Sequence, residues 1–314
     1  MPIFRRPNLL TAIVLLTACS ATSVAQGNTE REPVYVIAHM TNTPAAVDWA
    51  LEEGANGVEI DLRFNATHVP EVFHHRGVCD CICAPGKESV CRILGSESDG
   101  GHSNPCESRT GSANLLQHLA TKSQLALVVI DSKIEGMTIA AQETAGRSVI
   151  RALDENLFRS DKGYLGKVIV GTAKSQGTPY LKAAAGAANK SPNAKRIFFS
   201  FDQEAGRATE TIERLVGLPT KARAYGTGTT ACSLGPFGSA IEHGYRNKRV
   251  GVVSLVYIWT LDRKRSMERY LEKGARGIIT NYPRRAHDIV SRMGFELALP
   301  DTDLPWAKSD QVAR

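Results

Sequence analysis

The sequence predicts an α/β fold, a (β/α)8 barrel in a single domain. Three observations lead to this prediction: eight short runs rich in apolar and β-branched residues, stretches of helical composition between them, and no linker that divides the chain. Near-continuous apolar runs of this length are typical of parallel strands buried on both faces. We therefore expect strands at residues 34–38, 57–61, 125–130, 167–170, 196–200, 222–225, 251–258 and 277–280.

Helices are expected between these strands, with the clearest patterns at residues 45–53, 140–156 and 266–273. Gly54 and Gly274 follow the first and the last of them, where glycine favours the left-handed backbone that ends many helices. A doubly wound open sheet is the alternative fold. It is disfavoured because no glycine-rich fingerprint of a dinucleotide site follows the first strand.

The composition excludes several classes of protein. Of the 314 residues, 42% are hydrophobic and 22% are charged, and the formal net charge is only +6, so a disordered chain is excluded. Without residues 1–25 the chain has 36 basic and 32 acidic residues, a net charge of +4. No stripe of lysine and arginine with interleaved aromatic residues is present, so we expect no nucleic-acid partner.

Residues 1–25 are predicted to be a secretory signal, because Arg5 and Arg6 precede an apolar run that is followed by small residues. Cleavage before Gln26 is one possibility, and a lipoprotein box that ends at Cys19 is the other. The apolar run is too short to cross a bilayer core of about 30 Å. We expect residues 26–314 to be a secreted monomer without a transmembrane span, or a chain anchored by lipid on Cys19.

Export from the cell changes the interpretation of the six further cysteines. In an oxidising compartment an even number of cysteines predicts disulfides, and five of the six fall in residues 76–110, which we expect to form a Cys-rich loop on the catalytic face. A zinc site in the segment Cys79-Asp-Cys81-Ile-Cys83 is the alternative, although its spacing is not that of a CxxC pair.

Acidic side chains stand at the ends of two predicted strands, where a barrel carries its active groups. Glu59 and Asp61 close the second strand and point to the same side, while Asp131 ends the third. Three converging carboxylates repel one another, and oxygen-only ligands suit Mg²⁺ or Ca²⁺ better than zinc. The alternative is that each acid pairs with a lysine or an arginine.

Histidines accompany these acids. His39 follows the first strand, and His74 and His75 end a segment that is typical of a short strand within the loop after the second strand. One imidazole can activate an attacking oxygen while another protonates the leaving oxygen. The other polar or aromatic groups at strand ends are Lys133, Tyr257, Trp259 and Asn281.

In their order along the chain, several of these motifs resemble the secreted sphingomyelinase D / phospholipase D family, best known from recluse-spider venoms. The resemblance covers nearly the whole mature chain, including residues 299–307, which resemble a segment that plugs the barrel floor. Its motifs are Tyr35-Val-Ile-Ala-His-Met40, Gly54-Ala-Asn-Gly-Val-Glu-Ile-Asp61, His75 upstream of Cys79-Asp-Cys81, Leu127-Val-Val-Ile-Asp-Ser-Lys133, Tyr257-Ile-Trp-Thr-Leu-Asp262, Thr280-Asn-Tyr-Pro283 and Asp301-Thr-Asp-Leu-Pro-Trp306.

The resemblance implies a distorted (β/α)8 barrel with one Mg²⁺ ion and a set of residue roles. His75 is preferred to His74 because it keeps the family's distance to Cys79-Asp-Cys81. The implied roles are catalysis for His39 and His75; metal binding for Glu59, Asp61 and Asp131; phosphate contact for Lys133; pocket shape for Tyr257, Trp259, Asp262 and Asn281; and a disulfide between Cys81 and Cys232, with the partner of Cys79 open among Cys83, Cys91 and Cys106.

The implied activity is attack on a phosphodiester by a hydroxyl of the substrate itself, which releases choline and leaves a cyclic phosphate. Sphingomyelin or a lysophospholipid at a membrane surface is the expected substrate. Trp259 suits this head group, since an aromatic face attracts a quaternary ammonium by about 0.5–2 kcal/mol, although a core aromatic is the alternative. The competing functions are a glycerophosphodiester phosphodiesterase, which usually has His-Arg-Gly where this chain has His39-Met40-Thr41, and a secreted lipid-binding barrel without catalysis.

Overall fold

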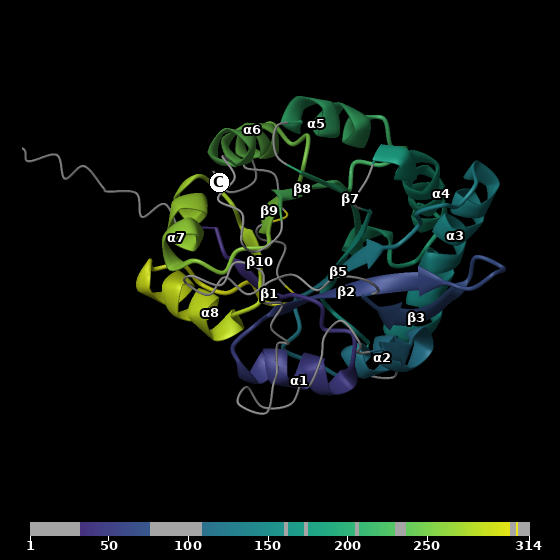
Figure 1. The fold of residues 1–314 in the computed structure, drawn as a ribbon, viewed down its shortest axis with the longest axis horizontal. Helices are drawn as coiled ribbons and strands as arrows, with labels where there is room; N and C mark the ends of the chain where they lie inside the picture. The colour runs from purple at the N-terminus through teal and green to yellow at the C-terminus, as the bar shows by residue number, and fades with distance from the viewer. Residues whose placement is uncertain are drawn as a thin grey trace, which may run out of the picture. The chain divides into compact units, whose positions relative to one another are not determined.

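A computed structural model describes residues 32–75, 109–159, 163–172, 175–204, 207–229, 237–301 and 306. Within these residues, eight parallel strands form a ring that closes where the first strand pairs with both the second and the last (Figure 1). The predicted (β/α)8 barrel is therefore confirmed. In ring order the strands are β1 (Tyr35–Ala38), β2 (Gly57–Phe64), β5 (Leu127–Ser132), β6 (Lys167–Thr172), β7 (Ile197–Glu204), β8 (Ala224–Gly228), β9 (Leu255–Trp259) and β10 (Gly277–Thr280).

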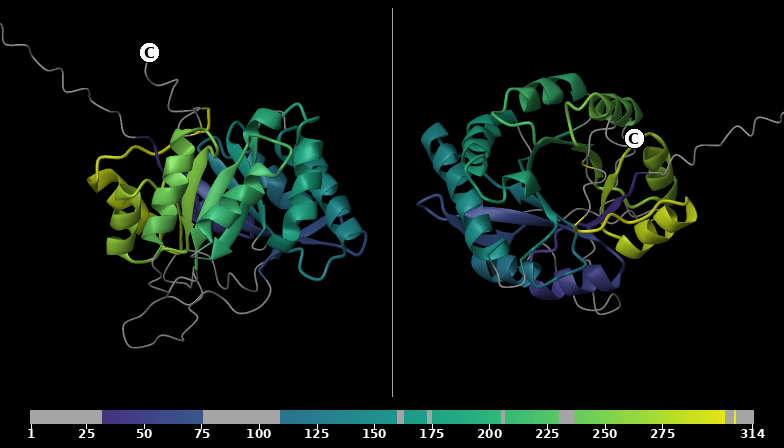
Figure 2. Two further views of the ribbon diagram at one scale, coloured as in Figure 1. Left: turned by 90° about the horizontal axis from the view of Figure 1, so that it is seen from above. Right: turned by 180° about the vertical axis from the view of Figure 1, so that it is seen from behind.

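Helices surround this ring of strands, as the view along the barrel and the two views in Figure 2 show. In the part of the chain that the structure describes, the α-helices are α1 (Pro44–Glu52), α2 (Ser112–Ala120), α3 (Ile139–Ala152), α4 (Thr178–Ala188), α5 (Ala208–Val216), α6 (Gly238–Arg249), α7 (Lys264–Glu272) and α8 (Pro283–Arg292). Shorter helical turns lie at Leu153–Leu157, Ser175–Gly177 and Ala194–Arg196.

Several boundaries differ from those predicted, and two of these differences have a clear local form. The strand expected from residue 251 begins at Leu255, because Gly251 has a φ of +73° in the turn that follows α6. The helix expected over residues 140–156 is α-helical only to Ala152 and continues as a π-helical turn. Gly54 and Gly274 have φ of +83° and +104°, so their predicted role at helix ends is confirmed.

The barrel has an inner and an outer core, because successive side chains of a strand point to opposite faces. On β2, Val58 and Ile60 belong to the apolar layer between the strands and the helices, whereas Glu59 and Asp61 line a cavity within the ring. The inner apolar cluster contains the first residues of β1, β5 and β9 and therefore fills the N-terminal end of the barrel. The polar side chains of the barrel interior therefore lie at its C-terminal end.

An antiparallel extension sits at the end of β2. Strand β3 (Pro70–His74) pairs with the second half of β2, so that Leu62 lies opposite Phe73, and β4 (Arg109–Gly111) pairs with β3. The short strand expected within this connection is thus present. The hairpin returns the chain to the C-terminal end of the barrel, where His75 follows β3 directly.

Trp306 closes the opposite end of the barrel. Its side chain is buried, its indole Nε1 donates a hydrogen bond of 2.6 Å to the Tyr35 hydroxyl, and its ring centroid lies 4.0 Å from that of Phe198. Both partners are near the starts of their strands. Trp306 lies where the plug segment is expected, although residues 302–305 and 307 are outside the described residues.

Residues 1–25, Cys19 and the six other cysteines also lie outside the described residues, so the secretory signal, the lipid anchor, the Cys-rich loop of residues 76–110 and the disulfides stay predictions. No helix among the described residues is long and apolar enough to cross a membrane.

Trp306→Ala is expected to destabilise the fold by about 3–5 kcal/mol, because it leaves a cavity against Phe198 and removes the bond to Tyr35. Denaturant unfolding measures this loss. Val250→Ala is the control, since the Val250 side chain is 74% exposed and its truncation should change little. A Trp306→Ala chain as stable as wild type would show that the C-terminal segment does not close the barrel.

Candidate active site

A cavity of about 160 Å³ lies at the C-terminal ends of the barrel strands. Strands far apart in the sequence contribute to it because all of them run in parallel around one ring. Its lining residues are His39, Glu59, Asp61, His75, Asp131, Lys133, Asp202, Trp259, Thr260 and Ile279. The structure therefore brings together both candidate histidines and all three candidate metal ligands.

Three of the carboxylates form a cluster that could hold a metal ion. Glu59, Asp61 and Asp131 each offer one oxygen, and these oxygens lie within 4.8 Å of one another. The register of the sheet explains the convergence, since Asp61 on β2 lies directly opposite Asp131 on β5. Glu59, one inward position earlier on β2, completes the group.

Lys133 supplies positive charge inside this cluster. Its Nζ lies 2.7 Å from Asp61 Oδ1 and also forms an ion pair with Asp131. Burial by itself raises the pKa of Asp61, but Lys133 and then His75 outweigh that effect and hold the pKa far below its usual range. Burial and then the charge of Asp61 raise the pKa of Glu59 well above its usual value. One lysine is therefore too little to neutralise three acids, of which two are buried and one is partly buried.

The donor set fits a hard divalent cation. The Oδ1 atom of Asp131 is buried and has no hydrogen-bond partner within the described chain, which is costly for a carboxylate oxygen unless a cation satisfies it. All three candidate ligands are carboxylates, the chemistry preferred by Mg²⁺ and Ca²⁺. A metal-binding cluster is thus present, while the choice of Mg²⁺ stays a prediction.

His75 is held against the acidic cluster. Its Nδ1 lies 3.1 Å from Asp61 Oδ1, and its side chain is partly buried. Burial alone lowers the pKa of His75, but the hydrogen bond and the charge of Asp61 raise it above the ordinary value. This environment favours an imidazolium that can give up a proton.

His39 is held by a chain of hydrogen bonds from residues that follow β10 and β9, next to β1 in the ring. Its Nδ1 lies 2.9 Å from Asn281 Oδ1, and the amide nitrogen of Asn281 donates to Asp262 Oδ2 over 2.9 Å. Asp262 Oδ1 also accepts the Asn281 backbone N–H over 2.9 Å. With its amide fixed in this way, Asn281 presents an oxygen to His39 and so favours the tautomer in which Nδ1 carries the proton. The other ring nitrogen, Nε2, then carries the lone pair and lies 3.9 Å from Glu59 Oε2.

Asp262 and Asn281 therefore act on the cavity through His39. Both are buried, and neither is among the residues that line the cavity. The sequence prediction that they shape the pocket holds only in this indirect sense. Asn42, which sequence reasoning missed, has a comparable position: its amide donates to Asp61 Oδ2 over 2.8 Å and so holds a candidate metal ligand.

Tyr257 and Trp259 lie on the same side of β9 but differ in how far their side chains are exposed to the cavity. Tyr257 is fully buried and lies outside the cavity lining, and its hydroxyl donates to Ser200 Oγ over 2.8 Å and to Asp202. Trp259 lines the cavity and is only partly buried. The aromatic surface available to a head group is thus that of Trp259, while Tyr257 supports Asp202.

Asp202 is the main functional candidate that sequence reasoning missed. It lies on β7, two residues past the predicted end of that strand, so the rule that selected Asp131 would have found it. Neighbouring glycines leave room for it: a Cβ on Gly226 would lie 2.4 Å from Asp202 Oδ1. Burial and then the charge of Asp131 raise the pKa of Asp202 to about 7.

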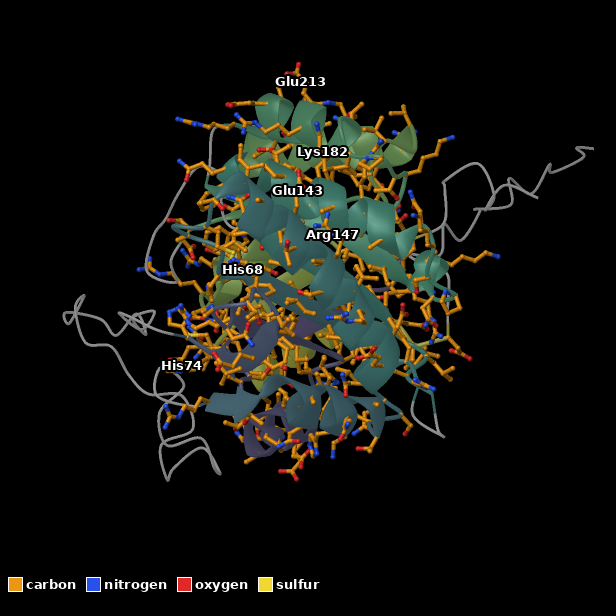
Figure 3. The ribbon with its side chains drawn as sticks, turned by 90° about the vertical axis from the view of Figure 1, so that its right-hand side faces the viewer. His68, His74, Glu143, Arg147, Lys182 and Glu213 are labelled. Carbon is orange, nitrogen blue, oxygen red and sulfur yellow. The ribbon has the colours of Figure 1, made fainter. Side chains whose placement is uncertain are left out.

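His74 is not brought into the site. It lies on β3 opposite Arg109, is absent from the cavity lining, and lies at the periphery of the molecule in Figure 3. Its neighbour His75 lies in the cavity instead, in agreement with the choice made from the sequence.

Comparisons with known proteins identify relatives over most of the chain. A family described as dermonecrotic toxin SPH matches residues 29–94 and 105–305, more than half of the chain. Dermonecrotic toxin LiSicTox-betaIA1i of Loxosceles intermedia is 27% identical over 296 residues, which cover 88% of this chain and 90% of that protein. Dermonecrotic toxin StSicTox-betaIB1i of Sicarius terrosus is also 27% identical, over 88% of this chain and 99% of its own.

Solved structures agree in fold. A putative glycerophosphoryl diester phosphodiesterase from Silicibacter pomeroyi is 14% identical, with a TM-score of 0.58 over 85% of this chain and 96% of its own. A glycerophosphodiester phosphodiesterase from Parabacteroides distasonis is 16% identical, with a TM-score of 0.54 over 84% of this chain and 99% of its own. At these identities the likeness establishes the shared barrel only.

Asp202→Asn is expected to make the chain relatively more stable at alkaline pH. The raised pKa of Asp202 adds stability at about pH 4 and below, and this contribution is lost as the pH rises through about 7, by up to about 4 kcal/mol. Asparagine removes this pH dependence and still accepts the bond from Tyr257. Thermal unfolding in a chelator, at pH values from about 5 to about 8, should show the melting temperature of the variant gaining on wild type by several degrees.

Asp301→Asn is the control, because Asp301 is exposed and its substitution should give no such gain. A melting-temperature difference between Asp202→Asn and wild type that stays constant with pH would contradict the raised pKa.

Proposed function

Since the chain belongs to the dermonecrotic toxin SPH family and is a phosphodiesterase, we propose that it is a phospholipase D of the sphingomyelinase D type. In this proposal it removes choline-type head groups from sphingomyelin or lysophospholipids, and the lipid keeps its phosphate as a cyclic ester. The observation that carries the proposal is the meeting of His39 and His75 with the three acids around one cavity.

The environments of the two imidazoles support opposite roles in proton transfer. Asn281 favours the His39 tautomer with its lone pair on Nε2, which suits a general base that takes the proton from the attacking hydroxyl of the substrate. His75, charged beside Asp61, suits a general acid that gives its proton to the departing choline oxygen. The hydroxyl oxygen forms a new bond to phosphorus as the bond to choline breaks, so the products are choline and a cyclic phosphate.

The residues around the cavity also suit the charges of such a substrate. Lys133 supports the binding of a phosphoryl oxygen, and the exposed face of Trp259 attracts a quaternary ammonium. Asp202 offers a carboxylate to the same cation when it is ionised. Glu59, Asp61 and Asp131 would hold one Mg²⁺, which would neutralise charge that develops on the phosphoryl group.

A place of action outside the cell follows from the same proposal. The relatives are named as toxins, and residues 1–25 have the pattern of a secretory signal. We infer that the mature chain is secreted, acts as a monomer, and meets its substrate at a lipid surface.

Mass spectrometry of the products from a mixed panel of lipids tests the proposed reaction. Choline release from sphingomyelin or lysophosphatidylcholine, with a lipid product lighter by one water than the hydrolysed phosphate, is the expected result, and a chelator should abolish it. Turnover of glycerophosphocholine alone would favour a glycerophosphodiester phosphodiesterase. Lipid binding without any turnover would favour a non-catalytic barrel.

His39→Asn and His75→Asn are each expected to lower kcat by about 10²–10⁴-fold, because each removes one proton-transfer group. Their melting temperatures should stay close to wild type, since asparagine keeps a polar group at each site. His74→Asn is the matched control and should keep full activity, because His74 lies outside the cavity. Wild-type turnover by either of the first two variants would exclude that histidine from the catalytic pair.

Asp131→Asn is expected to weaken Mg²⁺ binding by at least about 10-fold, because it removes one of three clustered carboxylates. Calorimetric titration of the purified chain with Mg²⁺ measures this effect without reference to activity. Asp202→Asn removes a charge from the same cavity outside the cluster and should change the affinity far less. Equal Mg²⁺ affinities of Asp131→Asn and wild type would reject Asp131 as a ligand.

A further inference from the structure

Exposed positive charge gathers beside the cavity, after the C-terminal end of β9. Thr260 lines the cavity, and Arg263, Lys264 and Arg265 follow it closely in the chain with exposed side chains. The first turn of the adjacent α8 contributes Arg285. Its guanidinium donates to the backbone oxygen of Asp262, which fixes α8 against this segment. We call these four cations the basic rim.

Little negative charge offsets the basic rim. Asp262 is the one acid within residues 260–265 and 281–285, and it is buried and hydrogen-bonded to Asn281. Within the described part of the chain, Arg263, Lys264 and Arg265 form no ion pair. By contrast, Arg284 in the same region is bound to Glu53.

These cations lie where they destabilise their own helix. Arg263 is the N-cap of α7, and Lys264 and Arg265 are its first residues, with no acid in that first turn. The N-terminal end of a helix carries a partial positive charge, so cations there are unfavourable by about 0.3–1 kcal/mol each. This placement is expected if an external anion offsets the repulsion.

We propose that the basic rim docks the protein onto a lipid surface that contains anionic phospholipids, with the cavity facing that surface. A lipid surface fits better than a nucleic acid, because the cations lie at the edge of a cavity whose proposed substrate is a lipid, and because the cavity itself is lined by four acids that would repel a polyphosphate chain. The choice of a lipid surface as the partner rests on the proposed function, whereas the presence of the basic rim does not.

Co-sedimentation of the full chain with vesicles tests this docking surface. Wild type should bind vesicles of phosphatidylglycerol mixed with phosphatidylcholine, bind phosphatidylcholine vesicles much less, and lose affinity as salt is added. Lys264→Glu combined with Arg265→Glu should weaken binding by at least about 30-fold, since each cation near an anionic surface contributes about 1 kcal/mol. Glutamate suits the first turn of a helix, so this variant should fold at least as stably as wild type.

Lys182→Glu combined with Lys190→Glu is the matched control for charge. Both side chains are exposed on and after α4, and Figure 3 labels Lys182 on the outer wall of the barrel. This control should keep most of the binding to anionic vesicles. Equal losses in the two double variants would overturn the inference, because net charge alone would then explain binding.

Two other outcomes would also overturn it. One is a wild-type chain that releases head groups from detergent-dispersed substrate but does not bind anionic vesicles, which would leave the proposed function standing. The other is tighter binding of single-stranded RNA than of vesicles, lost in Lys264→Glu/Arg265→Glu. A chain that binds the vesicles through the basic rim but cleaves no lipid would instead support the docking surface and reject the proposed function.

Discussion

Mutual repulsion among three clustered carboxylates is the constraint on which the rest of the site depends. Glu59, Asp61 and Asp131 are brought within reach of one ion by the register of β2 and β5, and burial makes each negative charge costly. Lys133 offsets one of the three negative charges, and the raised pKa of Glu59 reflects the negative charge that remains. A divalent cation would neutralise the negative charge that remains, so the cluster is best understood as incomplete without one.

The catalytic geometry follows from the way in which each histidine is anchored. His75 is bonded to the carboxylate cluster through Asp61, whereas His39 is held through Asn281 and Asp262, which follow β10 and β9. The two rings therefore differ in electrostatic environment although they share one cavity. The Nδ1 of His75 is bonded to a carboxylate and the Nδ1 of His39 to an amide oxygen, a difference that suits the opposite proton-transfer roles proposed for the two rings.

The sequence was enough to predict the barrel and the acidic cluster, because both follow local rules. Buried parallel strands leave continuous apolar runs, and active groups of a barrel stand at strand ends. Asp202 was missed because the apolar stretch that marked its strand stops two residues earlier, and the sequence did not show that Tyr257, on the inner side of β9, is covered by packing. Burial depends on neighbours from distant strands, such as the small Gly226 beside Asp202, and no local pattern encodes that proximity.

Opposite charges at the mouth of this barrel coexist because they meet different dielectric surroundings. Glu59, Asp61 and Asp202 are buried and Asp131 is partly buried, so their interactions with each other and with Lys133 are strong and only weakly screened by salt. Arg263, Lys264 and Arg265 face solvent, where salt screens charges over about 8–10 Å. The acids of the cavity and the exposed cations can therefore each interact with a different partner. In the proposed function the cavity binds a cation and a phosphodiester at short range, and the basic rim responds to the overall charge of the surface that presents that substrate.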